Sequence, residues 1–370
     1  MPSSISSFER SSVRLTASDR PGVAQPVPVR DVPAQPWGKI FIVALLLFAL
    51  LLAAWEAYWR DYGSVPAYRN SDGLWAMQRR RVDAGEGGRT VLLGASRMLF
   101  DIDLDTWERL SGTRPIQLAL EGTSPLFALE DLADDPKFTG RLLVGVAPDV
   151  FFSGFARRGD VLKYTRKESP SQRAGQWLSM HLVEPLFAFY DPDFALATVV
   201  NRQDWPLREG LLRKTSVRRL SVCDADRNTR MWSKVERDPE YQALAQRIWA
   251  ERNFAPLDAV NQAKLDLTIQ KQLDRAVIAV DKLRVRGIDI TFVRPPSAGG
   301  YLEYENRAFP RAKTWQPLLA MTGVRGIHFE DYPELQGYRL PEWSHLAADE
   351  KPRFTEALVR IVEQQSAVKP

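Results

Sequence analysis

Cysteine and histidine are scarce in this chain of 370 residues. Cys223 is the single cysteine, so neither an internal disulfide nor a cysteine-based metal site can form within one chain. The histidines are His181, His328 and His345, and any histidine-dependent chemistry has to use one of these three side chains.

An excess of one charge sign is also nearly absent. Lys and Arg number 50 against 46 Asp and Glu, which gives a formal net charge of +4. Residues 1–39 contribute about half of this excess. A nucleic-acid-binding domain concentrates positive charge on one face, so we predict no nucleic-acid partner.

Residues 1–36 are rich in Ser, Pro and Arg and follow neither a helical nor a strand period. Such a segment buries too little apolar surface to offset its ordering entropy, and we predict a disordered tail. The apolar segment WGKIFIVALLLFALLLAAWEAYW follows over residues 37–59, with no charge from Ile40 to Trp55. As a helix it would be about 34 Å long, enough to cross the core of a bilayer.

Two alternatives to a membrane anchor are a cleaved signal peptide and a buried core helix. A signal peptide has a short charged region and a small-residue cleavage site, whereas this run follows a long tail and ends in bulky Trp55, Tyr58 and Trp59. A core helix is usually shorter and lacks interfacial aromatic flanks. We therefore predict an uncleaved transmembrane anchor over residues 37–59.

The charges beside this segment predict its orientation. Lys39 and four arginines precede it, whereas Arg60 and Asp61 follow it and offset each other. The positive-inside rule then places the N-terminus in the cytoplasm and residues 60–370 outside. In a bacterium, this describes a single-pass protein of the inner (cytoplasmic) membrane with a periplasmic or extracellular domain.

Strand and helix patterns alternate after the anchor. Strands are predicted over residues 90–93, 115–120, 141–146, 288–293 and 325–329. Helices are predicted over residues 103–112, 125–133, 265–286, 315–322 and 351–364. This alternation predicts an α/β fold with three layers, in which helices cover both faces of a mostly parallel sheet. Residues 151–255 interrupt it and are predicted to form a largely helical insertion between the two parts of the domain, 60–150 and 256–370.

Polar residues follow the first and last of these strands. Ser96 comes directly after the first strand, in the turn Gly-Ala-Ser-Arg. Glu342 precedes His345 by three residues in a loop after the last strand. Functional groups gather beyond the carboxyl ends of parallel strands, so we expect these three side chains to meet at one sheet edge. There, His345 can take the proton of Ser96 while Glu342 orients the imidazole.

This order of residues resembles the SGNH (GDSL-type) hydrolase superfamily, whose fold is SGNH/flavodoxin-like. The resemblance implies that Ser96 is the nucleophile, His345 the base and Glu342 the acid. It also implies an oxyanion hole made by the backbone N–H groups of Ser96 and Gly122. The third block of the family usually holds an asparagine donor, but the sequence VGVAPDVFF has Ala147 and Pro148 there. No metal or cofactor is needed for this chemistry.

A narrower resemblance is to membrane-anchored SGNH-like proteins of D-alanyl-lipoteichoic-acid synthesis and alginate O-acetylation. It implies transfer of an acyl group, most simply acetyl, to an envelope or secreted polysaccharide. It further implies a polytopic membrane-bound O-acyltransferase as partner and a glycan as acceptor. An esterase of the same fold and a non-catalytic envelope scaffold are the alternatives.

Two arginines are candidates for binding substrate. Arg97 follows the serine and is expected either to hold an anionic group there or to pair with Asp101 or Asp103. Arg294 ends the fourth strand and is expected either to line the cleft or to form a salt bridge.

Overall fold

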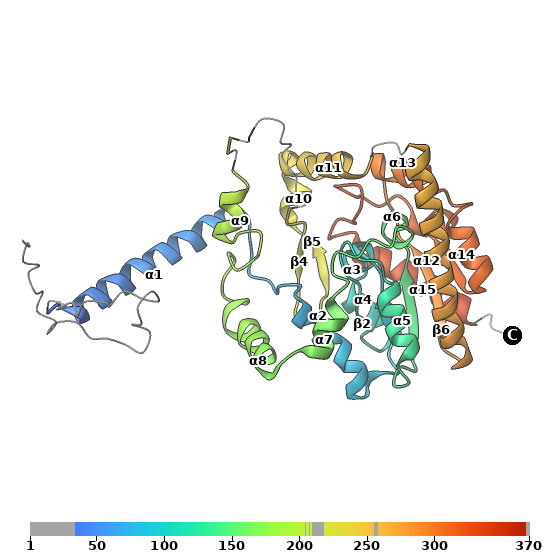
Figure 1. The fold of residues 1–370 in the computed structure, drawn as a ribbon, viewed down its shortest axis with the longest axis horizontal. Coiled ribbons are helices and arrows are strands. Elements are labelled where there is room, and N and C mark those ends of the chain that lie inside the picture. Colours follow the sequence, from blue (N-terminus) through green and yellow to red (C-terminus); the bar gives the residue numbers. More distant parts are fainter. Residues whose placement is uncertain (1–33, 204, 207, 209–217, 255–257, 368–370) are drawn as a thin grey trace, which may run out of the picture. The chain divides into compact units, whose positions relative to one another are not determined.

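A parallel five-stranded sheet forms the centre of the structure (Figure 1). The computed structural model describes residues 34–203, 205–206, 208, 218–254 and 258–367. The strands follow the order β2-β1-β3-β6-β7. Their bounds are β1 (Val91–Leu93), β2 (Ile116–Gln117), β3 (Arg141–Gly145), β6 (Asp289–Arg294) and β7 (Arg325–His328).

Helices cover both faces of this sheet. On one face, Val91, Leu142 and Ile290 belong to a buried core shared with α5 (Leu126–Asp134), α12 (Ala259–Val285) and α14 (Trp315–Thr322). Because strand side chains alternate, Leu92 and Leu143 point to the opposite face. On that face lie α4 (Leu104–Ser111) and α15 (Lys351–Ala367), which pack against each other (Figure 1). The α/β fold with a parallel sheet is thus confirmed.

The predicted helix ends are also present. The Asp103 carboxylate caps α4 by accepting a hydrogen bond from Thr106 N at 2.9 Å, and Gly112 ends the helix with a left-handed φ of 74°. Gly287 (φ 72°) comes directly after Arg286, the C-cap residue at the end of α12. The second strand is shorter than predicted, although Leu120 N still bonds to Gly94 O at 2.9 Å beyond its end.

Several short helices connect the larger elements. They are α2 (Asp72–Arg81), α3 (Ser96–Phe100), α6 (Pro148–Phe151) and α13 (Gly299–Ala308). Single π- or 3₁₀-turns lie at η2 (Val82–Glu86), η3 (Ser179–Val183), η4 (Phe329–Asp331) and η5 (Pro333–Leu335).

Residues 151–255 contain both helices and a hairpin. The helices are α7 (Val161–Lys167), α8 (Pro170–Leu178), α9 (Leu196–Asn201), α10 (Ser233–Arg237) and α11 (Pro239–Asn253). The hairpin pairs β4 (Ser221–Cys223) with β5 (Thr229–Met231) in antiparallel register, a feature that the sequence analysis did not anticipate.

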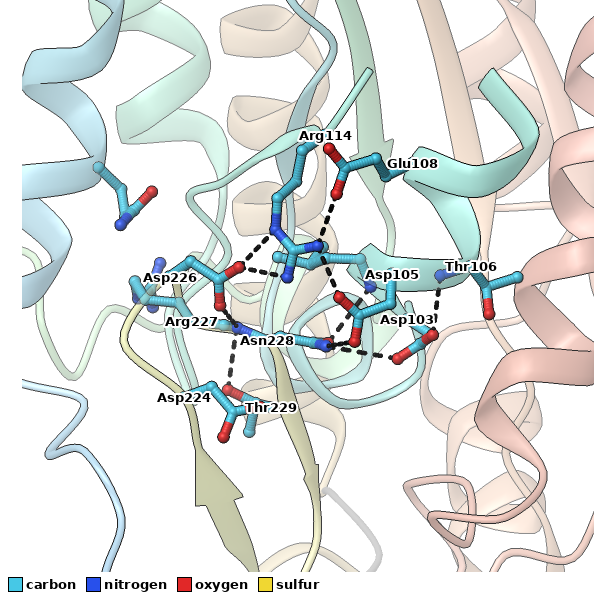
Figure 2. Close-up of polar contacts among 12 residues, drawn as sticks. Asp103, Asp105, Thr106, Glu108, Arg114, Asp224, Asp226, Arg227, Asn228 and Thr229 are labelled. Carbon is cyan, nitrogen blue, oxygen red and sulfur yellow. Dashed lines mark hydrogen bonds and ion pairs between the residues drawn. The ribbon is translucent and has the colours of Figure 1, made fainter. Parts of the chain in front are cut away.

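The turn of this hairpin docks on the start of α4 (Figure 2). Asn228 Oδ1 accepts a hydrogen bond from Leu104 N at 3.3 Å, and Arg114 bridges Asp226 and Asp105 at 2.6 Å each. These contacts fix the hairpin to the sheet domain.

The N-terminal helix α1 (Trp37–Asp61) is long and apolar enough to cross a membrane, with a mean hydropathy of 2.6 in its most apolar stretch. The chain divides into two units after Trp55, and Glu56–Pro370 forms the second. A tail is predicted over residues 1–36. Residues 1–33 of this segment lie outside the described residues.

Candidate active site

Glu342 and His345 form a buried pair in the loop between β7 and α15. Glu342 Oε1 lies 2.8 Å from His345 Nδ1 and also accepts the His345 backbone N–H at 2.7 Å. The two residues are 0% and 1% exposed. Trp343, between them, has a left-handed φ of 72°, a strained conformation for a bulky residue that tightens the turn. The three-residue spacing therefore brings acid and imidazole together, as the sequence predicted.

The neighbours of Glu342 stabilise the ionised form of its carboxyl group. Burial by itself raises the pKa of this carboxyl, but His345 and the indole of Trp249 outweigh burial and lower the pKa below its ordinary value. An ionised Glu342 accepts the Nδ1–H of His345 and leaves Nε2 as the nitrogen that can take a proton. His345 Nε2 is buried and has no hydrogen-bond partner among the described residues.

Ser96 is the first residue of α3 and is half-buried. Two glycines leave room for Met98, which belongs to the same helix. A Cβ at Gly94 would come within 2.4 Å of Met98 Cγ, and a Cβ at Gly145 would come within 1.8 Å of the same atom. Residues four apart share a helix face, so Ser96 lies on the same face as Phe100. The Phe100 ring stacks on the His345 imidazole, with centroids 4.2 Å apart.

Other contacts also bring α3 against the loop that holds His345. Arg97 Nε donates to Ser344 Oγ at 3.3 Å, and Asp101 Oδ1 accepts from Leu346 N at 3.0 Å. Ser96 thus begins a helix from which Arg97 and Asp101 contact the residues directly before and after His345 in the sequence. The hydroxyl makes no hydrogen bond to His345 Nε2 in this structure, and such catalytic bonds often tighten only when substrate is bound.

Gly122 lies beyond the neighbouring strand. The hydrogen bond from Leu120 N to Gly94 O sets the turns after β1 and β2 side by side. Ser96 follows Gly94 by two residues, and Gly122 follows Leu120 by two residues. Gly122 has a left-handed φ of 56°, and its carbonyl accepts from Arg157 N at 2.9 Å. Its contribution to an oxyanion hole stays a prediction.

The turn after β3 contains no asparagine. Ala147 precedes α6, and Pro148 is the first residue of that helix. Proline has no backbone N–H, so Pro148 offers no donor at this edge of the sheet.

A buried ionic network lies beside α3. Glu305 of α13 forms an ion pair with Arg97, with Nη1 2.9 Å from Oε1, and accepts a hydrogen bond from Arg294 Nη2 at 2.7 Å; all three residues are buried. Burial by itself raises the pKa of Glu305, but the two guanidinium groups outweigh it and lower this pKa. The expectation that Arg97 pairs with Asp101 or Asp103 is wrong, because Glu305 is its partner. Arg294 forms the salt bridge that was one of its two predicted roles, and a substrate-binding role for either arginine stays a prediction.

Two other buried carboxyls lie near this network. Burial raises the pKa of Asp101 to about 7 against the opposing effect of His345, and Asp101 Oδ2 has no hydrogen-bond partner among the described residues. Burial, together with the charge of Glu305, also raises the pKa of Asp149, whose Oδ2 accepts from the Tyr301 hydroxyl at 2.5 Å. These carboxyls favour their neutral form more than exposed ones do.

The sequence did not predict a place in the site for Trp249, Phe100 or Glu305. Trp249 Nε1 donates to Glu342 Oε2 at 2.5 Å, although the two residues are 93 positions apart and belong to different parts of the chain. No local pattern in the sequence marks such a contact. In the described residues no group of three or more His, Cys, Asp or Glu side chains is arranged to hold a metal ion. No protein-family model matches this chain, and no curated protein is significantly similar to it.

Proposed function

We propose that this protein is a membrane-anchored SGNH-like acyltransferase that modifies an envelope or secreted polysaccharide through an acyl-enzyme on Ser96. The observation that carries the proposal is the buried Glu342–His345 pair, whose imidazole stacks on the helix that Ser96 begins. A serine from one turn, and an imidazole and a carboxylate from a second turn, are the parts needed for serine-dependent acyl transfer.

The reaction proceeds in two halves. Ser96 Oγ attacks the carbonyl carbon of an acyl donor while its proton passes to His345 Nε2. The tetrahedral oxyanion is held by the N–H groups of Ser96 and Gly122, and collapse expels the leaving group, which takes the proton from His345. A sugar hydroxyl then attacks the acyl-serine, gives its proton to His345, and leaves as the ester as the proton returns to Ser96.

The membrane topology supplies the setting for this proposal. With α1 as a single-pass anchor of the bacterial inner membrane and the N-terminus in the cytoplasm, the catalytic domain lies in the periplasm or outside the cell. An acyl donor made in the cytoplasm then has to cross the membrane, which a polytopic membrane-bound O-acyltransferase would accomplish.

Ser96→Ala tests the nucleophile directly. The full-length protein is treated with a fluorophosphonate probe, which labels activated serines, and the adduct is located by mass spectrometry. We expect labelling of Ser96 in the wild type, none at that position in Ser96→Ala, and full labelling in Ser366→Ala, which removes a hydroxyl bonded to Val362 O on α15. A wild type that stays unlabelled would contradict the proposal.

One observation favours a rival. Ala147 and Pro148 leave the oxyanion hole without the usual asparagine, and loss of one oxyanion donor can cost about 2.7–4 kcal/mol of barrier. A non-catalytic envelope scaffold would then keep its cellular function in Ser96→Ala. An esterase would label like the transferase but would release the acyl group to water even when an oligosaccharide acceptor is present.

A further inference from the structure

An apolar stripe faces outward along residues 174–186, from α8 into η3 and the turn that follows. Its exposed members are Ala174, Trp177, Leu178, His181, Leu182, Pro185 and Leu186. Spacings of three and four residues place them on one helical face, and His181 is the single titratable side chain among them.

The opposite face of the same segment turns toward the domain, and Met180 is its one buried apolar side chain. Gln176 Oε1 accepts from Ser71 Oγ at 2.8 Å, and Ser179 Oγ donates to Glu184 at 2.6 Å. A helix on the surface of a soluble domain normally has the reverse arrangement, with its apolar face inward. The outward apolar face therefore has to be covered by something outside this domain.

The stripe contains large side chains. Trp177, Leu182 and Leu186 are 54%, 55% and 58% exposed. The Trp177 ring stacks on His181 with centroids 4.4 Å apart, which gives a flat ring pair with polar nitrogens on an otherwise apolar surface. Such amphipathic rings favour the interface between lipid headgroups and acyl chains.

The end of the stripe is fastened to the last turns of α1. The Glu56 carboxylate accepts hydrogen bonds from Ala188 N at 2.9 Å and Phe189 N at 3.1 Å. Arg60 Nη2 donates to Leu186 O at 3.0 Å. Glu56 directly follows the uncharged apolar run, so these bonds hold the stripe within a few residues of the place where a membrane-crossing helix leaves the bilayer.

A second exposed apolar group follows a few residues later in the chain. Trp59 stacks on Phe194 at 4.1 Å, and α9 begins two residues later with Leu196, which is 66% exposed. Val200 follows on the same helix and is also exposed. In Figure 1, α8 and α9 lie at the same end of the catalytic domain. Exposed apolar side chains therefore lie both before and after the segment 186–194 that contacts the end of α1.

We infer that the stripe and α9 form a membrane-contact surface, which rests in the lipid interface and seats the catalytic domain on the bilayer. The occupant is phospholipid, because attachment to α1 keeps this surface beside the bilayer whether or not a protein partner is bound. An interfacial apolar face of this kind lies about 5–10 Å into the boundary between headgroups and acyl chains. The inference rests on membrane anchoring by α1 and does not depend on the chemistry of Ser96.

Site-specific fluorescence quenching tests this contact in the full-length protein. Leu182→Cys and Leu178→Cys are each labelled with an environment-sensitive fluorophore and reconstituted into vesicles of phosphatidylcholine and phosphatidylglycerol that contain doxyl-labelled lipid. Val285→Cys is the matched control, because Val285 is an apolar residue that is 90% exposed at the end of α12. Leu47→Cys reports on the anchor itself. The native Cys223 is buried and does not compete for the label.

We expect the doxyl lipid to quench labels at 182 and 178 several-fold more than the label at 285, and aqueous iodide to do the reverse. Because the stripe holds so little charge, this pattern should persist at high salt. Labels at 182 and 178 that iodide quenches as readily as the label at 285 would overturn the inference. Protection from both quenchers would also overturn it, in favour of a protein contact.

The label at residue 47 separates two kinds of failure. If lipid quenches the Leu47→Cys label but not the Leu182→Cys label, the anchor stands and the membrane-contact surface does not. If neither label is quenched by lipid, α1 is not a membrane anchor and the inference falls with it.

Discussion

The indole of Trp249 donates a hydrogen bond to the carboxylate of Glu342, with Nε1 2.5 Å from Oε2. Trp249 belongs to α11, within residues 151–255, whereas Glu342 lies in the loop before the final helix. The other oxygen of the same carboxylate faces His345. The segment that interrupts the α/β alternation therefore supplies part of the environment of Glu342.

Trp249→Phe removes this hydrogen bond and keeps most of the ring. A hydrogen bond to a charged group contributes about 1.5–3 kcal/mol, so we expect fluorophosphonate labelling of Ser96 to slow roughly ten- to hundredfold. Because the same bond lowers the pKa of Glu342, the acidic limb of the pH–rate profile should also move to higher pH. Trp177→Phe, at an exposed position, is the control and should leave both unchanged. Labelling of Trp249→Phe at the wild-type rate would mean that the bond plays no part in reactivity.

Glu342→Gln removes the charge that orients His345. In serine triads the equivalent amide replacement costs on the order of 10⁴-fold in rate, because the imidazole is held in the wrong tautomer. We expect a loss approaching this size in the labelling rate, with partial retention in Glu342→Asp, which keeps the charge but shortens the reach. Glu334→Gln, at an exposed position in the same loop region, should label normally. Equal rates in Glu342→Gln and the wild type would remove Glu342 from the mechanism.

Glu305→Ala leaves two buried guanidinium groups, those of Arg97 and Arg294, without their shared carboxylate. Breaking a buried ion pair by removal of one partner costs about 3–5 kcal/mol, so we expect a loss of unfolding free energy of this order. Glu303→Ala alters an exposed glutamate of the same helix and should change the free energy by less than about 0.5 kcal/mol. Urea denaturation in detergent, followed by tryptophan fluorescence, measures both. Similar values for the two variants would show that the network contributes little to stability.

Asp101→Asn should change how stability depends on pH. Asp101 has an ordinary pKa of 3.8 and a pKa of about 7 in the folded protein, where it faces His345, Glu342 and Arg97. Between these values the folded state keeps a proton that the unfolded chain releases, so raising the pH lowers the unfolding free energy by about 1.4 kcal/mol per pH unit. The variant lacks this slope and should gain stability relative to the wild type as the pH rises from 4 to 7.

Denaturation curves at several pH values test this effect. Asp349→Asn, which changes an exposed carboxylate, should keep the pH dependence of the wild type. The lowered pKa of Glu342 makes the unfolding free energy rise with pH, but only below the ordinary pKa of that carboxyl. All three proteins share this effect. Parallel curves for the wild type and Asp101→Asn would contradict the raised pKa.

Much of the fold follows from short-range patterns in the sequence. The helix over Trp315–Thr322 has its predicted bounds, and the ends of α4 follow Asp103 and Gly112, since caps and periods act over a few residues. The Glu342–His345 pair was predictable for the same reason, because one turn joins the two side chains. The hairpin of β4 and β5 was not, because its turn is held by contacts with α4 from another part of the chain.

By itself, the sequence determined the alternation of strands and helices, an apolar segment long enough for a membrane, and the candidate site residues Ser96, Glu342 and His345. Tertiary structure alone decided the partners that come from distant parts of the chain. Arg97 contacts Ser344 across 247 positions and pairs with Glu305 rather than with a nearby aspartate. It also decided that the apolar face of residues 174–186 points outward. A periodic pattern fixes which side chains share a face, whereas the packing of distant segments fixes what that face meets.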